Sequence, residues 1–154
     1  MVRFDVVAMG GTFDIIHRGH TALLEAAFAA SKKVIIGLSS DELAKKKGKN
    51  LRHPYSQRLD ALKLFVEKNF QNKEYLISKL DNDFGPAAIE GNVQALITSE
   101  ETAYKGQTLN KLRAEKKLGP VETVVVPMVL AKDGQRISTT RIRNSEIDAQ
   151  GNLL

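Results

Sequence analysis

Short apolar runs alternate with helical patterns along the whole sequence, and this order limits the possible folds more than any other feature. The runs at 4–9, 33–38, 74–78, 94–98 and 121–126 have the composition of buried strands. Apolar residues at helical spacing lie between them at 21–31 and 56–69. Further helices are expected at 41–46, at 109–117 and from Ser138. Strands separated by helices form a parallel sheet with right-handed crossovers. The sequence therefore predicts an α/β, Rossmann-like fold: one domain over 1–154, with a doubly wound, five-stranded parallel sheet and helices on both faces.

In such a sheet, ligands bind beyond the carboxyl ends of the strands, where the winding reverses. We expect the loops at 10–20, 39–54, 98–108 and 127–141 to meet at this edge. Two of them hold capping-box patterns, Ser39 with Glu42 and Thr98 with Glu101. A flexible segment is expected at 104–108, before the helix at 109–117.

The loop after the first strand has the features of a phosphate site. Gly10 and Gly11 let the backbone turn sharply and approach a ligand. Gly19 opens a helix whose first N–H groups have no partner within the helix and can bind an anion. His17 and His20 lie at that opening and can both donate hydrogen bonds to the same anion. A plain turn with two surface histidines is the alternative, but two of the chain's three histidines are here.

A run of hydroxyl residues begins the last predicted helix. Ser138, Thr139 and Thr140 offer hydroxyl and N–H groups to phosphate oxygens, and Arg143 can add a charge-assisted hydrogen bond. In isolation, Ser138 or Thr139 is more simply a helix N-cap, worth about 1 kcal/mol. Together with the glycine turn, the run predicts a second phosphate-binding element.

The net charge of +5 and the pI near 9.5 call for an anionic partner. Only 6% of the residues are aromatic, which is few for stacking nucleic-acid bases, so we expect small polyphosphate ligands and no nucleic acid. We expect no membrane contact, because no apolar run approaches the roughly 20 residues that cross a bilayer. The lack of cysteine excludes disulfides and thiolate chemistry, and with a first segment typical of a strand it favours a cytoplasmic location.

Residues 11–14, Gly-Thr-Phe-Asp, and 17–20, His-Arg-Gly-His, resemble the signature of the nucleotidylyltransferase superfamily, and residues 137–143 resemble its second element. The resemblance implies that a substrate phosphate attacks the α-phosphate of a nucleoside triphosphate and releases pyrophosphate, without a covalent enzyme intermediate. His20 and His17 would stabilise the growing charge, and Thr12 would lie between the reacting phosphates. Mg²⁺ would be carried by the triphosphate and not by a metal site of the protein, and Asp14 would form the turn. The implied ATP-binding residues are Gly10, Gly11, Thr12, Phe13, His17, Gly19, His20, Thr98, Ser138, Thr139, Thr140 and Arg143.

The chain as a whole resembles the archaeal and eukaryotic type of the phosphopantetheine adenylyltransferase family, through segments 37–43, 54–58, 80–87, 98–102 and 129–134. Members of that family use ATP and 4′-phosphopantetheine to make dephospho-coenzyme A and pyrophosphate in coenzyme A biosynthesis. Lys47 or Lys49 would then neutralise the acceptor phosphate, with Lys47 counted among the catalytic residues. The implied phosphopantetheine-binding residues are Thr12, Ser39, Lys47, Lys49 and Arg58. A surface salt bridge explains Arg58 equally well, and helix capping explains Thr98.

Two alternatives stay open. A sister enzyme, either a cytidylyltransferase for glycerol phosphate or phosphocholine or an adenylyltransferase for flavin or nicotinamide mononucleotide, would need the same phosphate-binding residues. His17 is shared with the cytidylyltransferase branch, so the motifs leave the base open. A basic RNA-binding module on the same fold is the alternative from another class of protein.

Overall fold

A single sheet of five strands forms the centre of the computed structural model, which describes residues 3–82, 84–85, 92–127, 129–135, 137, 141–142 and 145–154. The strands are β1 (Phe4–Gly11), β2 (Ser31–Ser39), β3 (Glu74–Leu80), β4 (Ala95–Ser99) and β5 (Glu122–Val126). Their spatial order is β3-β2-β1-β4-β5, and each neighbouring pair is parallel. The helices are α1 (Arg18–Ala30), α2 (Asp41–Lys46), α3 (Tyr55–Asn69) and α4 (Lys105–Glu115). The predicted doubly wound parallel fold is confirmed, with the winding reversed between β1 and β4.

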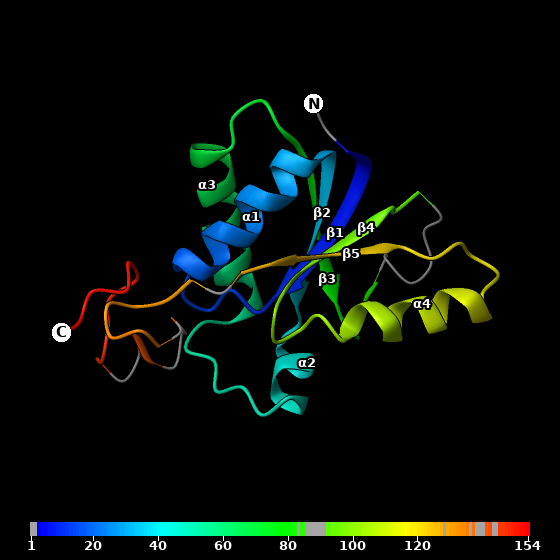
Figure 1. Ribbon diagram of the computed structural model, residues 1–154. Coiled ribbons are helices and arrows are strands. Elements are labelled where there is room, and N and C mark those ends of the chain that lie inside the picture. The colour runs from blue at the N-terminus through cyan, green and yellow to red at the C-terminus, as the bar shows by residue number, and fades with distance from the viewer. Residues whose placement is uncertain are drawn as a thin grey trace.

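The helices form a layer on each face of the sheet, with α1 and α3 on one side and α4 on the other (Figure 1). Alternate residues of β1 point to the two layers. Val7 and Met9 join the apolar cluster that contains Leu24 of α1 and Leu62 of α3. Val6 and Ala8 join a second cluster that contains Leu109 of α4. Each residue at the end of a strand can therefore be assigned to the α1 side or to the α4 side of the sheet.

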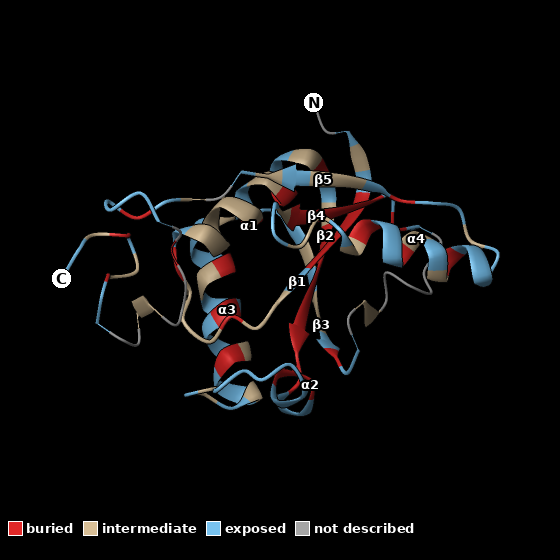
Figure 2. Ribbon diagram, turned by 60° about the horizontal axis from the view of Figure 1, so that its bottom comes forward, coloured by how far each residue is buried: buried red, intermediate tan, exposed pale blue. Residues whose placement is uncertain are grey.

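Burial follows this layering (Figure 2). Strands β2 and β4 consist mostly of buried residues and β1 has a buried central stretch, whereas the helices keep exposed outer faces. This explains the nearly continuous apolar runs in the sequence, since a strand covered on both faces needs no alternation of polar residues. Among the helices of the described ranges, none is both long and apolar enough to span a bilayer.

The predicted flexible segment at 104–108 is wrong, because α4 already begins at Lys105. Gly106, which lies in this segment, is a position of close packing. A Cβ atom at this position would lie 1.8 Å from the Thr123 hydroxyl of β5. Glycine therefore lets α4 approach the sheet, and the helix begins four residues earlier than predicted.

Neither predicted capping box forms. Ser40, and not Ser39, caps α2, because its hydroxyl accepts the Leu43 N–H at 3.0 Å. After β4 the Ser99 N–H donates to the Thr102 hydroxyl, and Thr98 caps nothing. The last predicted helix cannot be compared in full, since Ser138 lies outside the described residues. The remaining elements begin and end close to their predicted bounds.

Candidate active site

A cavity of about 380 Å³ opens at the carboxyl ends of β1 and β4, where the winding of the sheet reverses. All four loops expected at this edge contribute to its wall. Of the predicted site residues that the structure describes, every one except Arg58 lines the cavity. They are Gly10, Gly11, Thr12, Phe13, His17, Gly19, His20, Ser39, Lys47, Lys49 and Thr98.

The turn after β1 brings backbone and aromatic surface to the cavity. A Cβ atom on Gly10 would lie 3.2 Å from Leu80 Cδ1 and 3.4 Å from the Gly37 carbonyl oxygen. Glycine at this position therefore leaves room for the close packing of Leu80 against the end of β1. Phe13 has a φ of 51°, in the left-handed region that a bulky side chain seldom adopts. Its ring is buried against His20, with 4.7 Å between the ring centroids. Backbone strain of this kind is typical of functional sites, where the surrounding packing maintains it.

His17 and His20 are locked together at the start of α1. His17 is the N-cap: its Nδ1 accepts the Gly19 N–H at 3.1 Å, while its own N–H donates to His20 Nδ1 at 3.3 Å. The two imidazole rings stack with their centroids 3.9 Å apart. A Cβ atom on Gly19 would lie only 2.8 Å from the His17 ring, so this stack requires glycine there. The spacing of the motif thus builds a rigid pair of rings beside the first N–H groups of a helix.

His20 is a neutral imidazole at physiological pH. Burial lowers the pKa of His20 to about 3, and the charges of the neighbouring His17 and Lys49 lower it as well. A hydrogen bond with the Ile15 backbone raises this pKa, but by less. Because Nδ1 accepts the His17 N–H, the proton of the neutral ring is on Nε2. The ring can therefore donate one hydrogen bond to an anion without first carrying a charge.

This lowered pKa predicts a loss of stability in mild acid. The unfolded chain takes up a proton on His20 below pH 6.5, whereas the folded chain does not until about pH 3. Stability then falls by at most about 1.4 kcal/mol per pH unit, which is at most about 2 kcal/mol between pH 6.5 and pH 5. We expect urea denaturation at pH 7, 6 and 5 to show this loss in the native chain and a smaller loss in His20→Gln. Parallel pH profiles for the two proteins would contradict it.

The loop between α2 and α3, residues 47–54, is called the basic loop below, and it places two lysines at the cavity. Lys47 and Lys49 line it, whereas Lys45 and Lys46 of α2 do not. The loop leaves α2 through a fixed turn, in which the Lys49 N–H donates to the Ala44 carbonyl at 2.9 Å. The prediction that Lys47 or Lys49 contacts the acceptor phosphate is therefore consistent with their position at the cavity. Sequence spacing alone could not distinguish them from Lys45 and Lys46.

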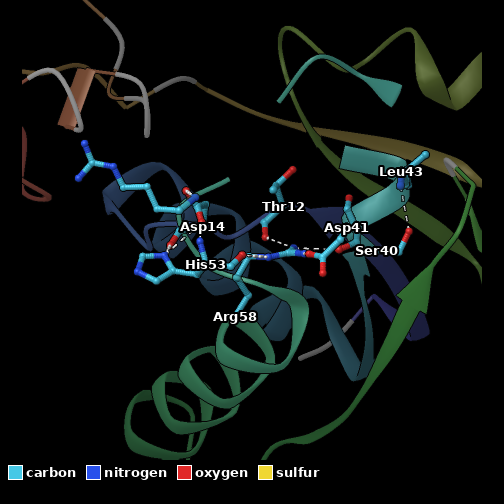
Figure 3. A network of polar contacts seen from close by, with 9 residues as sticks. Thr12, Asp14, Ser40, Asp41, Leu43, His53 and Arg58 are labelled. Carbon is cyan, nitrogen blue, oxygen red and sulfur yellow. Dashed lines mark hydrogen bonds and ion pairs between the residues drawn. The ribbon is translucent and has the colours of Figure 1, made fainter. Parts of the chain in front are cut away.

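Arg58 does not line the cavity, and the prediction that it binds the acceptor is corrected here. Its side chain points instead toward Thr12, Asp41 and His53 (Figure 3). Its side chain is fully buried and donates four hydrogen bonds within the protein. The acceptors are the carbonyls of His53 at 3.1 Å, Thr12 at 2.9 Å and Ser39 at 2.8 Å, and the Asp41 carboxylate at 2.7 Å. Arg58 thus joins the ends of β1 and β2 to the end of the basic loop. The sequence did not predict this because nothing local to α3 shows its arginine pointing inward.

Asp14 holds the same loop from the other side (Figure 3). Its carboxylate accepts the N–H groups of Arg52 at 3.2 Å and His53 at 3.1 Å, and His53 Nδ1 lies 3.1 Å from it. Asp14 is therefore more than a turn-forming residue: it connects the glycine turn to the loop that carries the two lysines. His53, the third histidine, takes part in this connection, which sequence reasoning missed.

The residues of the second predicted phosphate element, Ser138, Thr139, Thr140 and Arg143, lie outside the described residues. The residue before the run, Ile137, lines the same cavity as the histidines. Its N–H donates to the Val129 carbonyl at 3.2 Å, and it packs with Ala131 and Ile147 in a small separate apolar cluster. The chain therefore returns to the cavity immediately before the hydroxyl run.

The apolar wall of the cavity was also missed by sequence reasoning. It includes Leu23, Leu80, Phe84, Leu96, Val126 and Val129. Most of these residues lie at or near the carboxyl ends of strands, and that position is the signal that could have identified them. In the part of the chain that the structure describes, no three His, Asp or Glu side chains are grouped so as to hold a metal ion.

Comparison with known proteins gives concordant matches. The profile of the cytidylyltransferase-like family matches residues 8–145. The phosphopantetheine adenylyltransferases of Pyrococcus abyssi and Pyrococcus horikoshii are 42% and 44% identical to the chain, over 99% of its length and 97% and 96% of theirs. A solved structure from Archaeoglobus fulgidus, of a protein of unknown function, superposes with a TM-score of 0.70 at 27% identity, over 80% of this chain and 89% of that one.

Proposed function

This chain belongs to the cytidylyltransferase-like family and, within it, to the phosphopantetheine adenylyltransferases, and from that premise we propose that it transfers the adenylyl group of ATP to 4′-phosphopantetheine. The products are dephospho-coenzyme A and pyrophosphate, and the reaction is reversible. The observation that carries the proposal is one cavity that unites the histidine pair of α1 with the lysines of the basic loop. Such a cavity can hold two phosphate groups of different molecules side by side.

The reaction needs no nucleophile from the protein. An oxygen of the acceptor phosphate attacks the α-phosphorus of ATP, a new P–O bond forms, and the bond to the bridging oxygen of the leaving pyrophosphate breaks. Catalysis then consists of positioning the two phosphates and stabilising the charge that grows in the transition state. Both are tasks for fixed hydrogen-bond donors and cations.

The histidines and the start of α1 bind the phosphates of the nucleotide. The Nε2–H of His20 donates to the α-phosphate or to the leaving pyrophosphate, and His17 holds that ring in place. The helix N-terminus and the glycine turn accommodate the remaining phosphate oxygens. A bound triphosphate favours the protonated form of His20, so its pKa rises on binding.

The basic loop serves the acceptor. Lys47 or Lys49 neutralises the phosphate of 4′-phosphopantetheine, and Thr12 lies between the two reacting phosphates. Asp14 and Arg58 hold the basic loop beside the glycine turn, because both make hydrogen bonds to residues of the loop. The nucleophile and the electrophile are thus held by segments that are tied to each other.

Mg²⁺ fits this site as a companion of the triphosphate. Asp14 and Glu101 bring carboxylates to the cavity wall, but that of Asp14 already accepts the N–H groups of Arg52 and His53. The lysines of the basic loop and the two histidines of the α1 start line the same cavity, and they suit phosphate oxygens better than a metal ion. When bound to ATP, Mg²⁺ supplies charge neutralisation on the phosphates. We propose that it arrives with the nucleotide, and that the enzyme works in the cytoplasm on these water-soluble substrates.

The proposal is tested by measuring pyrophosphate release with Mg²⁺, with ATP or CTP, and with each acceptor: 4′-phosphopantetheine, glycerol phosphate, phosphocholine, and flavin and nicotinamide mononucleotides. Among these combinations, we expect turnover only with ATP and 4′-phosphopantetheine. ATP and dephospho-coenzyme A should each raise the Tm, because they bind the folded state. Turnover with CTP and none with ATP would favour a cytidylyltransferase. Tight, steeply salt-dependent binding of oligonucleotides without any effect of ATP would favour an RNA-binding module.

A further inference from the structure

The cavity straddles the edge of the sheet and has two halves that differ in chemistry. In β4, Ile97 belongs to the apolar cluster on the α1 side and Leu96 to the cluster on the α4 side. Since side chains alternate along a strand, Ser99 points to the α1 side and Thr98 to the α4 side. The same alternation in β1 places Gly10 on the α4 side and Gly11 on the α1 side.

The α1 half is the place for the nucleotide. It contains the stacked histidines and the start of α1. The loop residue Ile137, which immediately precedes the hydroxyl run, lines the same cavity. A triphosphate at the start of α1 would extend its nucleoside along this side of β4 and β5. The α4 half of the same cavity is then left for the second substrate.

The α4 half is lined from the strands by uncharged residues. They are Gly10, Ser39, Leu80, Leu96 and Thr98, and Phe84 packs on the cluster of the same side. Ser39 ends β2 directly before α2 and the basic loop that brings Lys47 and Lys49 to the cavity. Glu101, shortly before α4, and Lys105, at its start, also line the cavity, so charged residues border this half. An acceptor phosphate held by Lys47 or Lys49 would lead along the uncharged strand ends, which suit an uncharged, largely apolar chain.

One polar atom of the α4 half has no protein partner. Thr98 is only 5% exposed, and among the residues that the structure describes its hydroxyl oxygen is the buried side-chain polar atom that lacks a hydrogen bond. A buried hydroxyl without a protein partner is unfavourable, so a ligand that reaches it can supply the missing hydrogen bond. A hydroxyl can donate or accept, and both are useful toward an amide.

We propose that the α4 half binds the uncharged arm of the acceptor and that the Thr98 hydroxyl is its hydrogen-bond partner, toward an amide group of the arm. Thr98 is thereby assigned to the acceptor and not to the adenine side on which the sequence had placed it. The inference rests on the proposed function, because 4′-phosphopantetheine joins a phosphate to an amide-containing chain with methyl and methylene groups. Those apolar groups match Leu80, Leu96 and Phe84.

The test compares Thr98→Val, which keeps the shape and removes the hydroxyl, with Thr98→Ser, which keeps the hydroxyl. We expect Thr98→Val to raise the KM for 4′-phosphopantetheine by about 3- to 10-fold, the range for one neutral hydrogen bond, with the KM for ATP unchanged. Its Tm should rise by about 2–4 °C, because an unpaired buried hydroxyl is removed. If the hydroxyl had only a structural role, its removal would not both raise the Tm and weaken the binding of 4′-phosphopantetheine alone.

Thr98→Ser should keep a KM for 4′-phosphopantetheine near that of the native enzyme. The proposal is overturned if Thr98→Val changes neither KM, or if it raises the KM for ATP instead. Should the valine variant not fold, Thr98→Ala against Thr98→Ser gives the same comparison, since the two differ only in the hydroxyl. Failure of the proposed function is distinguishable, because the native enzyme itself would then show no turnover with 4′-phosphopantetheine.

Discussion

Replacing His20 with asparagine is expected to lower turnover by about 10²–10³-fold, the effect of removing one preorganised donor to transition-state charge. The asparagine carbonyl can still accept the His17 N–H that His20 Nδ1 accepts in the native protein. What the variant lacks is the Nε2–H, which is the donor of the neutral ring. The loss should therefore appear in kcat, measured as pyrophosphate release at saturating ATP and 4′-phosphopantetheine.

His20→Gln is the matched control for that experiment. Its longer side chain can bring an amide N–H close to the position of Nε2, so it should be at least about tenfold more active than the asparagine variant. Both variants lose the ring stack with His17 and the contact with Phe13, so these losses do not explain a difference between them. Asparagine and glutamine variants of equal activity, or an asparagine variant close to the native rate, would remove the Nε2–H from the mechanism.

The fold and the centre of the site could be predicted because their signals are local. Apolar runs and helical spacing specify strands and helices one by one, and the rules for parallel sheets then fix where the loops meet. The spacing of His17, Gly19 and His20 likewise describes a helix start without reference to the rest of the chain. Residues next to one another in sequence supplied all of this information.

The features that sequence reasoning missed depend on contacts between distant segments. Gly106 lies in a segment predicted to be flexible, whereas in the structure it packs closely against Thr123 of β5. Arg58 indicated a ligand contact or a surface salt bridge, and it proved to be buried among three carbonyls from other segments. The Thr98 hydroxyl resembled a helix cap, and its lack of a partner is visible only once its surroundings are known. In each case the residue type was informative, but its partner lay elsewhere in the chain.

Arg58 makes the strongest prediction for stability. Arg58→Met keeps much of the buried volume but leaves the carbonyls of Thr12, Ser39 and His53 without their donors. An unsatisfied buried acceptor costs about 1–3 kcal/mol, and breaking a buried charged network costs about 3–5 kcal/mol. We expect the free energy of unfolding, measured by urea denaturation at pH 7, to fall by about 3–5 kcal/mol. Arg58→Lys should lose part of that amount, because an ammonium group cannot span the four acceptors.

Two controls separate this network from a general effect of losing an arginine or an ion pair. Arg18→Met makes the same substitution at an exposed position and should change stability by less than about 0.5 kcal/mol. Asp41→Asn removes the charge of the one partner that is about half exposed, at 47% of its side chain, and should cost less than about 1 kcal/mol. The carbonyls, and not the ion pair, would then account for most of the loss in Arg58→Met. If Asp41→Asn costs as much as Arg58→Met, the ion pair dominates and the backbone contacts of Arg58 do not hold the two strand ends together.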